Sequence, residues 1–291
     1  MDSVKNLPLT DDCHHWTNLG EVPWDLQKYW QQRYTIFPVY DDGIFMTEDA
    51  WYGVTPEPVA INLVYDLVAF ISPDKRTVID AFAGVGGNTI SLAMATEEDG
   101  YTPRFDKVIA IERDAAALAC AQHNAAIYGV VDKITWVLGD SFELLQILTE
   151  SPEKLGEDIR VDVATTVIFA SPPWGGPGYR TDEIFDLSTM EPYNLETLHD
   201  AYKAMDHALY LPRTSDLRQI AKLVPDGIKI DVVQYCVEGA SKAMVAYIPA
   251  AVDQAVDSDR VGESSDQPAE ASSDQATEEP SEEPANSCSL C

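Results

Sequence analysis

The residues of this chain best suited to chemistry are three acids and a glycine-rich turn. Asp80 precedes the turn, which reads Ala-Phe-Ala-Gly-Val-Gly-Gly-Asn-Thr and has Gly84 as its first glycine, while Glu112 and Asp140 each follow a later apolar run. Glycines let the backbone approach a small ligand closely. The Glu112 carboxylate suits the two hydroxyls of a ribose, and Asp140 suits an adenine amino group. The set predicts a site for an adenosine-type cofactor.

The glycine spacing excludes two better-known nucleotide sites. Thr89 stands where the dinucleotide fingerprint has its third glycine, and no Gly-Lys-Ser or Gly-Lys-Thr triplet is present to hold a triphosphate. A different adenosine-containing ligand is therefore expected.

A second pattern, Ser171-Pro172-Pro173-Trp174, follows another apolar run. Consecutive prolines fix the backbone and remove N–H donors, so carbonyl oxygens and the Ser171 hydroxyl remain as acceptors. Such a turn suits the exocyclic amine of a nucleobase, which is a double donor. Trp174 offers a flat face for stacking, and a positively charged base strengthens that contact. The alternative is a turn that only ends a strand, with Trp174 as a core residue.

Strands and helices that alternate separate these residues. Short apolar runs predict buried strands at 77–81, 107–112, 134–138 and 162–169, with helices at 88–96 and 114–128. We further expect a helix at 195–206, a strand at 208–211, a hairpin from 228–236 and 242–248, and N-terminal helices at 23–34 and 56–70. Such alternation predicts an α/β fold with a parallel sheet, at whose carboxyl edge the site residues meet.

The charge distribution limits the partners of the chain. Its 291 residues carry a net charge of −30, of which residues 253–291, with eleven acids and only Arg260 as a base, account for −10 and residues 1–252 for −20. This tail has almost no large apolar side chain and is expected to be disordered. The acidity of the remainder disfavours broad contact with a phosphate backbone but permits an enzyme that binds one nucleotide.

Other sequence features exclude several classes of protein. Five scattered cysteines do not indicate a disulfide framework, and neither a secretory pattern nor an apolar run of about 20 residues is present. The histidines are adjacent or isolated, so no metal site is expected. We therefore predict a protein without a membrane span or a bound metal.

Taken together, the motifs resemble those of a known family. The glycine turn after Asp80, Ser-Pro-Pro-Trp-Gly-Gly-Pro from Ser171, Lys-Tyr-Trp-Gln-Gln-Arg-Tyr from Lys28 and Trp-Tyr-Gly-Val-Thr-Pro-Glu from Trp51 look like trimethylguanosine synthase. The resemblance extends from about residue 22 to 247. It implies a class I, Rossmann-like methyltransferase sheet with helices on both faces, and an N-terminal helical extension that contributes to both pockets. S-adenosylmethionine is the implied cofactor.

The resemblance also implies roles for individual residues. Trp174 matches the platform that stacks on 7-methylguanine, and Ser171 and Pro172 match the surroundings of the accepting N2 amine. The implied cofactor positions are Phe37, Thr55, Asp80, Gly84, Glu112 and Asp140, and the implied cap-phosphate positions are Lys28, Tyr179 and Arg213. The family often has aspartate where Glu112 stands, a change that keeps the binding of a diol.

The implied reaction methylates N2 of the 7-methylguanosine cap of small nuclear and nucleolar RNAs in two rounds, giving 2,2,7-trimethylguanosine. Partners would be these capped RNAs and core proteins of their particles, and the location would be the nucleus, including the nucleolus. Two alternatives are an amino methyltransferase for an internal RNA or DNA base and a cap-binding adaptor without catalysis. We expect a flexible N-terminus (1–20), a helical extension (21–70), a methyltransferase domain (71–252) and a disordered acidic tail (253–291).

Overall fold

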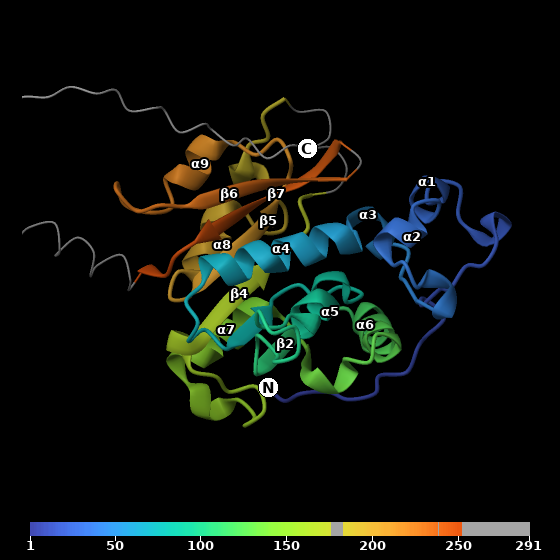
Figure 1. Ribbon diagram of the computed structural model, residues 1–291, viewed down its shortest axis with the longest axis horizontal. Helices are drawn as coiled ribbons and strands as arrows, with labels where there is room; N and C mark the ends of the chain where they lie inside the picture. Colours follow the sequence, from blue (N-terminus) through green and yellow to red (C-terminus); the bar gives the residue numbers. More distant parts are fainter. Residues whose placement is uncertain (176–182, 238, 252–291) are drawn as a thin grey trace, which may run out of the picture.

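A seven-stranded sheet lies at the centre of the protein (Figure 1). The computed structural model describes residues 1–175, 183–237 and 239–251. The strands are β1 (Thr77–Asp80), β2 (Lys107–Glu112), β3 (Ile134–Leu138), β4 (Thr166–Ala170), β5 (Asp206–Leu211), β6 (Asp231–Val237) and β7 (Ala240–Ile248). Their order is β3-β2-β1-β4-β5-β7-β6; the first five are parallel, and β7 is antiparallel to both neighbours. The predicted α/β fold of the class I, Rossmann-like type is confirmed.

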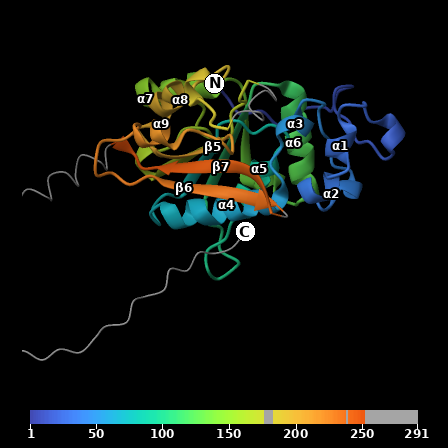
Figure 2. The same cartoon turned by 90° about the horizontal axis from the view of Figure 1, so that it is seen from above.

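Helices cover both faces of the sheet, as predicted (Figure 2). The helices α4 (Glu57–Phe70), α5 (Gly87–Met94) and α6 (Ala115–Ile127) pack on one face, and α7 (Ser141–Glu150), α8 (Leu195–Tyr202) and α9 (Leu217–Ala221) pack on the other. Two separate hydrophobic clusters result, one for each face. The central strands are buried on both sides, which explains why they appear in the sequence as continuous apolar runs.

The part of the N-terminal extension that precedes α4 forms one end of the molecule and consists of short helices (Figure 1). They are α1 (Gln27–Trp30), α2 (Arg33–Ile36) and α3 (Ala50–Gly53). Single 3-10 turns occur near them at Leu19–Glu21 and Tyr40–Asp42, and in the methyltransferase domain at Val131–Lys133, Pro152–Lys154, Val163–Thr165 and Leu187–Thr189. The single helix expected over 23–34 is therefore divided. The break lies at Gln32, whose φ of −94° and ψ of 8° leave the helical region.

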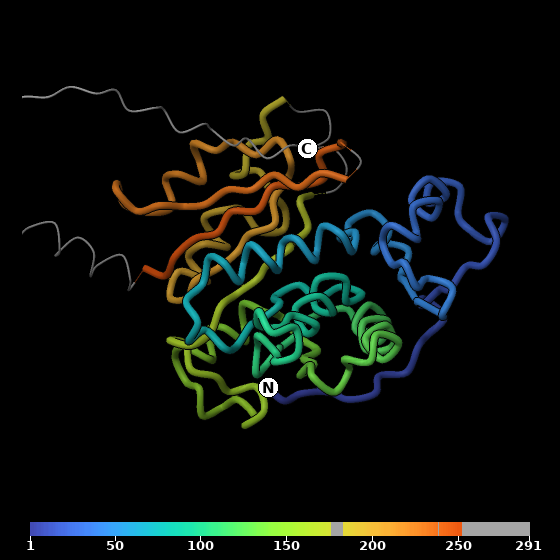
Figure 3. The backbone as a smooth tube through the Cα atoms, in the orientation of Figure 1, coloured from blue at the N-terminus to red at the C-terminus, as the bar shows by residue number. Residues whose placement is uncertain are grey.

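Residues 1–20 pack along the domain, which differs from the flexible segment expected from the sequence. The segment runs from the lower middle of the view along the edge of the domain to the extension at the right (Figure 3). Val4 donates its backbone N–H to Trp136 in β3 at 2.8 Å, and His14 pairs with Met46 as a short antiparallel bridge. Cys13 and Trp16 are both buried. Because these partners are distant in sequence, the local composition of the segment gives no sign of them.

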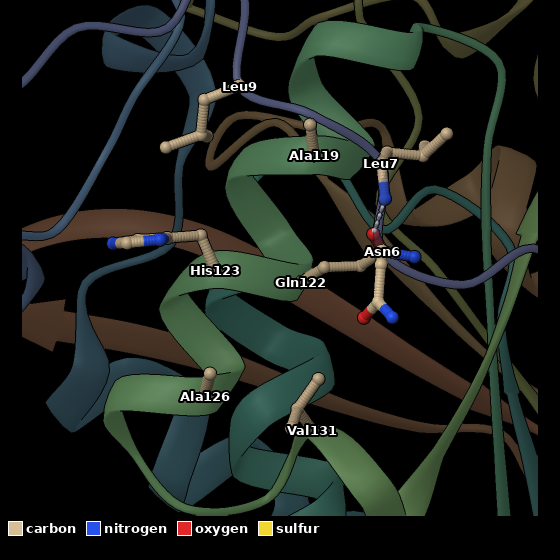
Figure 4. A pocket seen from close by; sticks show the side chains of 8 residues that line it. All are labelled: Asn6, Leu7, Leu9, Ala119, Gln122, His123, Ala126 and Val131. Carbon is tan, nitrogen blue, oxygen red and sulfur yellow. Dashed lines mark hydrogen bonds between the residues drawn. The ribbon is translucent and has the colours of Figure 1, made fainter.

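A small cavity of about 260 Å³ lies where this segment crosses α6 (Figure 4). Leu7 donates its backbone N–H to the side-chain oxygen of Gln122 at 2.8 Å, and Leu9 and Val131 contribute apolar walls. The N-terminal segment is thus fixed to the outer surface of α6. Among the described residues, no helix has the length and apolar character needed to cross a bilayer.

Candidate active site

A large cavity of about 1430 Å³ opens at the carboxyl edge of the parallel strands. Its wall brings together seven of the predicted site residues: Thr55, Gly84, Glu112, Asp140, Ser171, Pro172 and Trp174. Ligands of open α/β sheets bind at this edge because the strand ends and the following loops converge there. The cavity joins the predicted cofactor site to the predicted base site in a single space.

Glu112 stands at the end of β2 and organises the glycine turn beside it. One oxygen of its carboxylate accepts the N–H of Gly84 at 2.9 Å, and the other accepts the N–H groups of Arg113 and Asp114 at 2.8 and 2.9 Å. These bonds fix the side chain on the cavity wall. A carboxylate has about four acceptor sites, so Glu112 keeps capacity for a ligand hydroxyl.

Asp80 lies beneath the glycine turn and is fully buried, so it does not form part of the cavity wall. Its carboxylate accepts hydrogen bonds from the hydroxyl of Thr89 at 2.6 Å and from the N–H of Phe82 at 3.3 Å. The resemblance assigned Asp80 to the cofactor positions. In this geometry it supports the turn that would hold a cofactor.

Replacing Asp80 by asparagine is expected to make stability less dependent on pH. Burial raises the pKa of Asp80 from 3.8 to about 7, although the hydrogen bonds of Thr89 and Phe82 oppose the shift. Because the folded-state pKa is the higher one, the free energy of unfolding falls as the pH rises between these values and is constant above them. The measurement is urea unfolding at several values from about pH 5 to about pH 8. The free energy of unfolding of the variant, relative to that of the wild type, should rise up to about pH 7 and then stay constant. Parallel curves for the two proteins would contradict the shift.

The start of α5 packs against the N-terminal extension without any intervening side chain. A Cβ on Gly87 would lie 3.2 Å from Val54 and 3.3 Å from the carbonyl oxygen of Thr55. The side-chain amide of Asn88 donates to the Thr55 hydroxyl at 3.0 Å. Gly87 thus permits the close approach that brings Thr55 into the cavity wall.

Asn88 also supplies an acceptor that the sequence analysis did not single out. Its Oδ1 atom is buried at the cavity wall and has no hydrogen-bond partner among the described residues. A buried acceptor without a partner is costly, unless a ligand or a water satisfies it. The amino group of S-adenosylmethionine is a suitable donor, and the ribose suits Glu112. The residues present therefore fit this cofactor.

Asp140 follows β3 and has two structural partners. It caps α7 by accepting the N–H of Phe142 at 2.8 Å, and its other oxygen accepts the hydroxyl of Tyr193 at 3.2 Å. The rings of Phe142 and Tyr193 lie 4.3 Å apart, and Phe82 is 6.0 Å from Tyr193. Of these three rings, Phe82 and Tyr193 line the cavity and offer flat surfaces suited to a planar base. Tyr193 was not predicted, because its loop shows no motif.

Trp174 lies between the protein interior and the cavity. Its indole N–H donates to the carbonyl oxygen of Tyr210 at 3.2 Å, and the two rings stack at 5.8 Å with an interplanar angle of 15°. The side chain is half-buried, packs against both hydrophobic clusters and lines the cavity. Tyr210 and the indole hydrogen bond therefore fix the plane of a ring that is accessible from the cavity. Trp174 therefore contributes to the packing of the interior and also presents part of its side chain to the cavity.

Ser171 connects the base site to the cofactor site. Its hydroxyl lies 3.4 Å from the carbonyl oxygen of Phe82 and donates to it, and both residues line the cavity. The donated proton leaves the lone pairs of the Ser171 oxygen for a ligand donor. Pro172 is buried, and it cannot donate a backbone hydrogen bond.

The remaining predicted residues lie outside the described part of the cavity wall. Phe37 is buried and its ring lies 6.3 Å from that of Tyr128. Lys28 is exposed, with its ammonium group 4.8 Å from the ring centroid of Tyr29. Arg213 follows the end of β5 by two residues. Tyr179 lies outside the described residues.

The wall also contains residues that the sequence analysis did not name as site residues. Residues Thr10–Asp12 and His14 come from the N-terminal segment, and Thr47–Asp49 and Tyr52 come from the extension. The resemblance implied a contribution from the extension, and Tyr52 lies in one of its motifs, but nothing in the local sequence of the N-terminal segment indicates a site. Across the described residues, no group of three or more His, Cys, Asp or Glu is arranged to hold a metal ion.

Comparisons with known proteins agree with this geometry. The model of the RNA cap guanine-N2 methyltransferase family matches residues 75–251. Trimethylguanosine synthase of Schizosaccharomyces pombe is 35% identical over 229 residues, which cover 78% of this chain and 87% of that protein. Trimethylguanosine synthase of Saccharomyces cerevisiae is 33% identical over 201 residues, covering 68% of this chain and 58% of that protein.

Among solved structures, the METTL16 methyltransferase domain aligns with a TM-score of 0.46 and 16% identity, over 77% of this chain and 80% of that one. The O-methyltransferase TomG from Streptomyces achromogenes aligns with a TM-score of 0.44 and 14% identity, over 79% and 91% of the two chains. The family match and the yeast relatives lead to one conclusion. This chain belongs to the RNA cap guanine-N2 methyltransferase family and is an S-adenosylmethionine-dependent methyltransferase.

Proposed function

We propose that the substrates of this enzyme are 7-methylguanosine caps of small nuclear and nucleolar RNAs, which it converts to 2,2,7-trimethylguanosine in two rounds. The main support is that Trp174, Glu112 and Asp140 line one cavity. A stacking platform and cofactor-binding acids on one wall allow the base and the methyl donor to meet. The names of the two yeast relatives agree with this product.

Trp174 would select the methylated base through its charge. A 7-methylguanine carries a delocalised positive charge, and a cation over an indole face gains about 2 kcal/mol when it is desolvated. The acids on the same wall, Glu112 and Asp140, favour a cationic base further. An unmethylated guanine lacks both contributions, so a cap without the N7 methyl group should bind more weakly.

Ser171 and Pro172 would aim the accepting amine. The lone pair of a guanine amine is delocalised into the ring, which makes it a weak nucleophile. The Ser171 oxygen and the carbonyl of Pro172 can accept its two N–H groups and so fix its direction. S-adenosylmethionine supplies an activated methyl group when bound, and most of the catalysis by the residues named here would be positioning. The alkylated amine is acidic enough to release its proton to water.

Cationic residues would hold the phosphates of the cap outside the acidic cavity. Arg213 follows β5, and Lys28 is exposed on α1. We propose that both contact the triphosphate bridge, together with Tyr179. The placement of Phe37 near Tyr128 indicates an indirect role, in which it supports the extension beside the cofactor site.

The domain bounds, the protein partners and the cellular location of this chain are part of the same proposal. The extension over 21–70 and the domain over 71–252 would act as one catalytic unit, with the acidic tail from 253 outside it. Core proteins of small ribonucleoprotein particles would be partners, and the nucleus or nucleolus would be the location. The RNA-processing role of the relatives supports this setting.

The proposal is tested by the choice of substrate. The protein is incubated with S-adenosylmethionine and, separately, with 7-methyl-GTP, GTP and an uncapped oligonucleotide, and the products are analysed by mass. We expect one and then two added methyl groups on 7-methyl-GTP and none on the other two. Methylation of the oligonucleotide would favour an internal-base enzyme. Cap binding without methylation would indicate an adaptor and contradict the proposal.

A further inference from the structure

Three aromatic side chains of the extension form a partly exposed surface, which we call the aromatic ledge: Trp24, Tyr29 and Tyr52. Trp24 is 86% exposed and Tyr52 is 42% exposed. The rings of Tyr29 and Tyr52 meet edge to face at 5.3 Å. Asp25, the residue after Trp24, accepts a hydrogen bond from the Tyr52 hydroxyl, so the backbone next to Trp24 lies close to Tyr52. The ledge therefore combines α1, α3 and the turn before α1.

The ledge is continuous with the active-site cavity. Tyr52 lines the same cavity as Trp174, so the aromatic surface begins where the cavity opens. Scattered exposed aromatic residues are common on protein surfaces, whereas a group of them at the mouth of a ligand cavity indicates a binding surface. Trp24 contributes little to the core because most of its side chain is exposed, so folding does not explain its presence.

The charges around the ledge point to a nucleic-acid strand as the occupant. Lys28 holds its ammonium group 4.8 Å from the Tyr29 centroid. A cation next to aromatic platforms is typical of surfaces that bind single-stranded nucleic acid without sequence preference. Glu48 and Asp49 line the cavity beside Tyr52 and disfavour phosphate there, and Asp25, which accepts the Tyr52 hydroxyl, adds a further negative charge on the same side. The Lys28 side is thus the favourable path for a phosphate chain.

We infer that the aromatic ledge binds the first nucleotides after the cap, whose bases stack on Trp24 and Tyr52. This inference rests on the proposed action on capped RNA, because the cap in the cavity would anchor the strand. Stacking on aromatic side chains is tolerant of sequence. The ledge would therefore raise the affinity for capped RNA over the free cap, whatever the first nucleotides are.

The test compares a free cap with a capped strand. Dissociation constants are measured for 7-methyl-GTP and for a capped single-stranded oligonucleotide of four nucleotides, with the full chain and with Trp24→Ala. A stacked base contributes about 1–3 kcal/mol, so the variant should bind the oligonucleotide about 5- to 150-fold more weakly. Its affinity for 7-methyl-GTP should be unchanged, and Trp24→Phe should restore most of the loss. Tyr101→Ala, at a 90% exposed tyrosine outside the ledge, is the matched control.

A second oligonucleotide, with its first two bases removed, shows whether the bases make the contact. The wild type should bind it at least as weakly as Trp24→Ala binds the intact strand, because the contacts with Trp24 and Tyr52 are both lost, and Trp24→Ala should cause no further loss with this second oligonucleotide. Equal affinity of the wild type for the free cap and the capped strand would overturn the inference, as would equal losses for both ligands in Trp24→Ala. Failure to methylate 7-methyl-GTP would instead overturn the proposed function.

Discussion

Trp174→Ala is expected to lower kcat/KM for methylation of 7-methyl-GTP about 1000-fold. A desolvated cation–π contact of about 2 kcal/mol accounts for about 30-fold of this loss. The remainder follows from misplacement of the amine, since an error of about 1 Å costs about 100-fold. Steady-state kinetics with 7-methyl-GTP provide the measurement. Binding of S-adenosylmethionine, followed by calorimetry, should change little because Trp174 follows β4, which β1 separates from β2 and Glu112.

Trp174→Phe separates stacking from orientation. Phenylalanine keeps an aromatic face against Tyr210 but cannot donate the 3.2 Å hydrogen bond to its carbonyl oxygen. This variant should retain more activity than Trp174→Ala and less than the wild type. Turnover by Trp174→Ala close to that of the wild type would refute the stacking role.

Glu112→Ala is expected to weaken S-adenosylmethionine binding about 100-fold. Hydrogen bonds to a charged acceptor contribute about 1.5–3 kcal/mol, and the variant loses those to the ribose. It also releases the N–H groups of Gly84, Arg113 and Asp114, so the glycine turn loses its anchor. Calorimetric titration with the cofactor measures the effect.

Two further variants control for charge and for reach. Glu143→Ala removes an exposed acid from the first turn of α7 and should leave cofactor affinity unchanged. Glu112→Asp keeps the charge, and the family often has aspartate at this position, so it should lose less affinity than Glu112→Ala. If Glu112→Ala bound the cofactor as the wild type does, Glu112 would have no part in the cofactor site.

Elements with strong local signals could be predicted from the sequence. The strands β2 and β3 have the predicted bounds, and α4 differs by one residue. β4 begins four residues later than expected, because Asp162 caps a 3-10 turn over Val163–Thr165. The helix α7 was missed, because Asp140 was interpreted only as a ligand-binding acid, although it is also the N-cap of that helix.

From the residues alone, the site could be predicted where residues follow strands, whereas the prediction of Thr55 came from the resemblance. Parallel strands bring their carboxyl ends to one edge, so Glu112, Asp140 and Ser171 meet as expected. The local sequence does not show whether a residue will line the cavity or will support the residues that line it. Asp80 precedes the turn as the sequence shows, but burial places it below the wall, whereas Asn88 and Tyr193 reach the wall through tertiary packing.

The contribution of the first 55 residues to the cavity wall limits how far this enzyme can be shortened. A fragment restricted to residues 75–251 would keep every strand of the sheet. It would lack Thr10, Glu48, Tyr52 and Thr55 from the wall, and Gly87 would face solvent where it now meets Val54. A fragment that begins at the sheet would therefore lose about a third of the residues that line the cavity, and we expect an active version of this protein to need its first 55 residues.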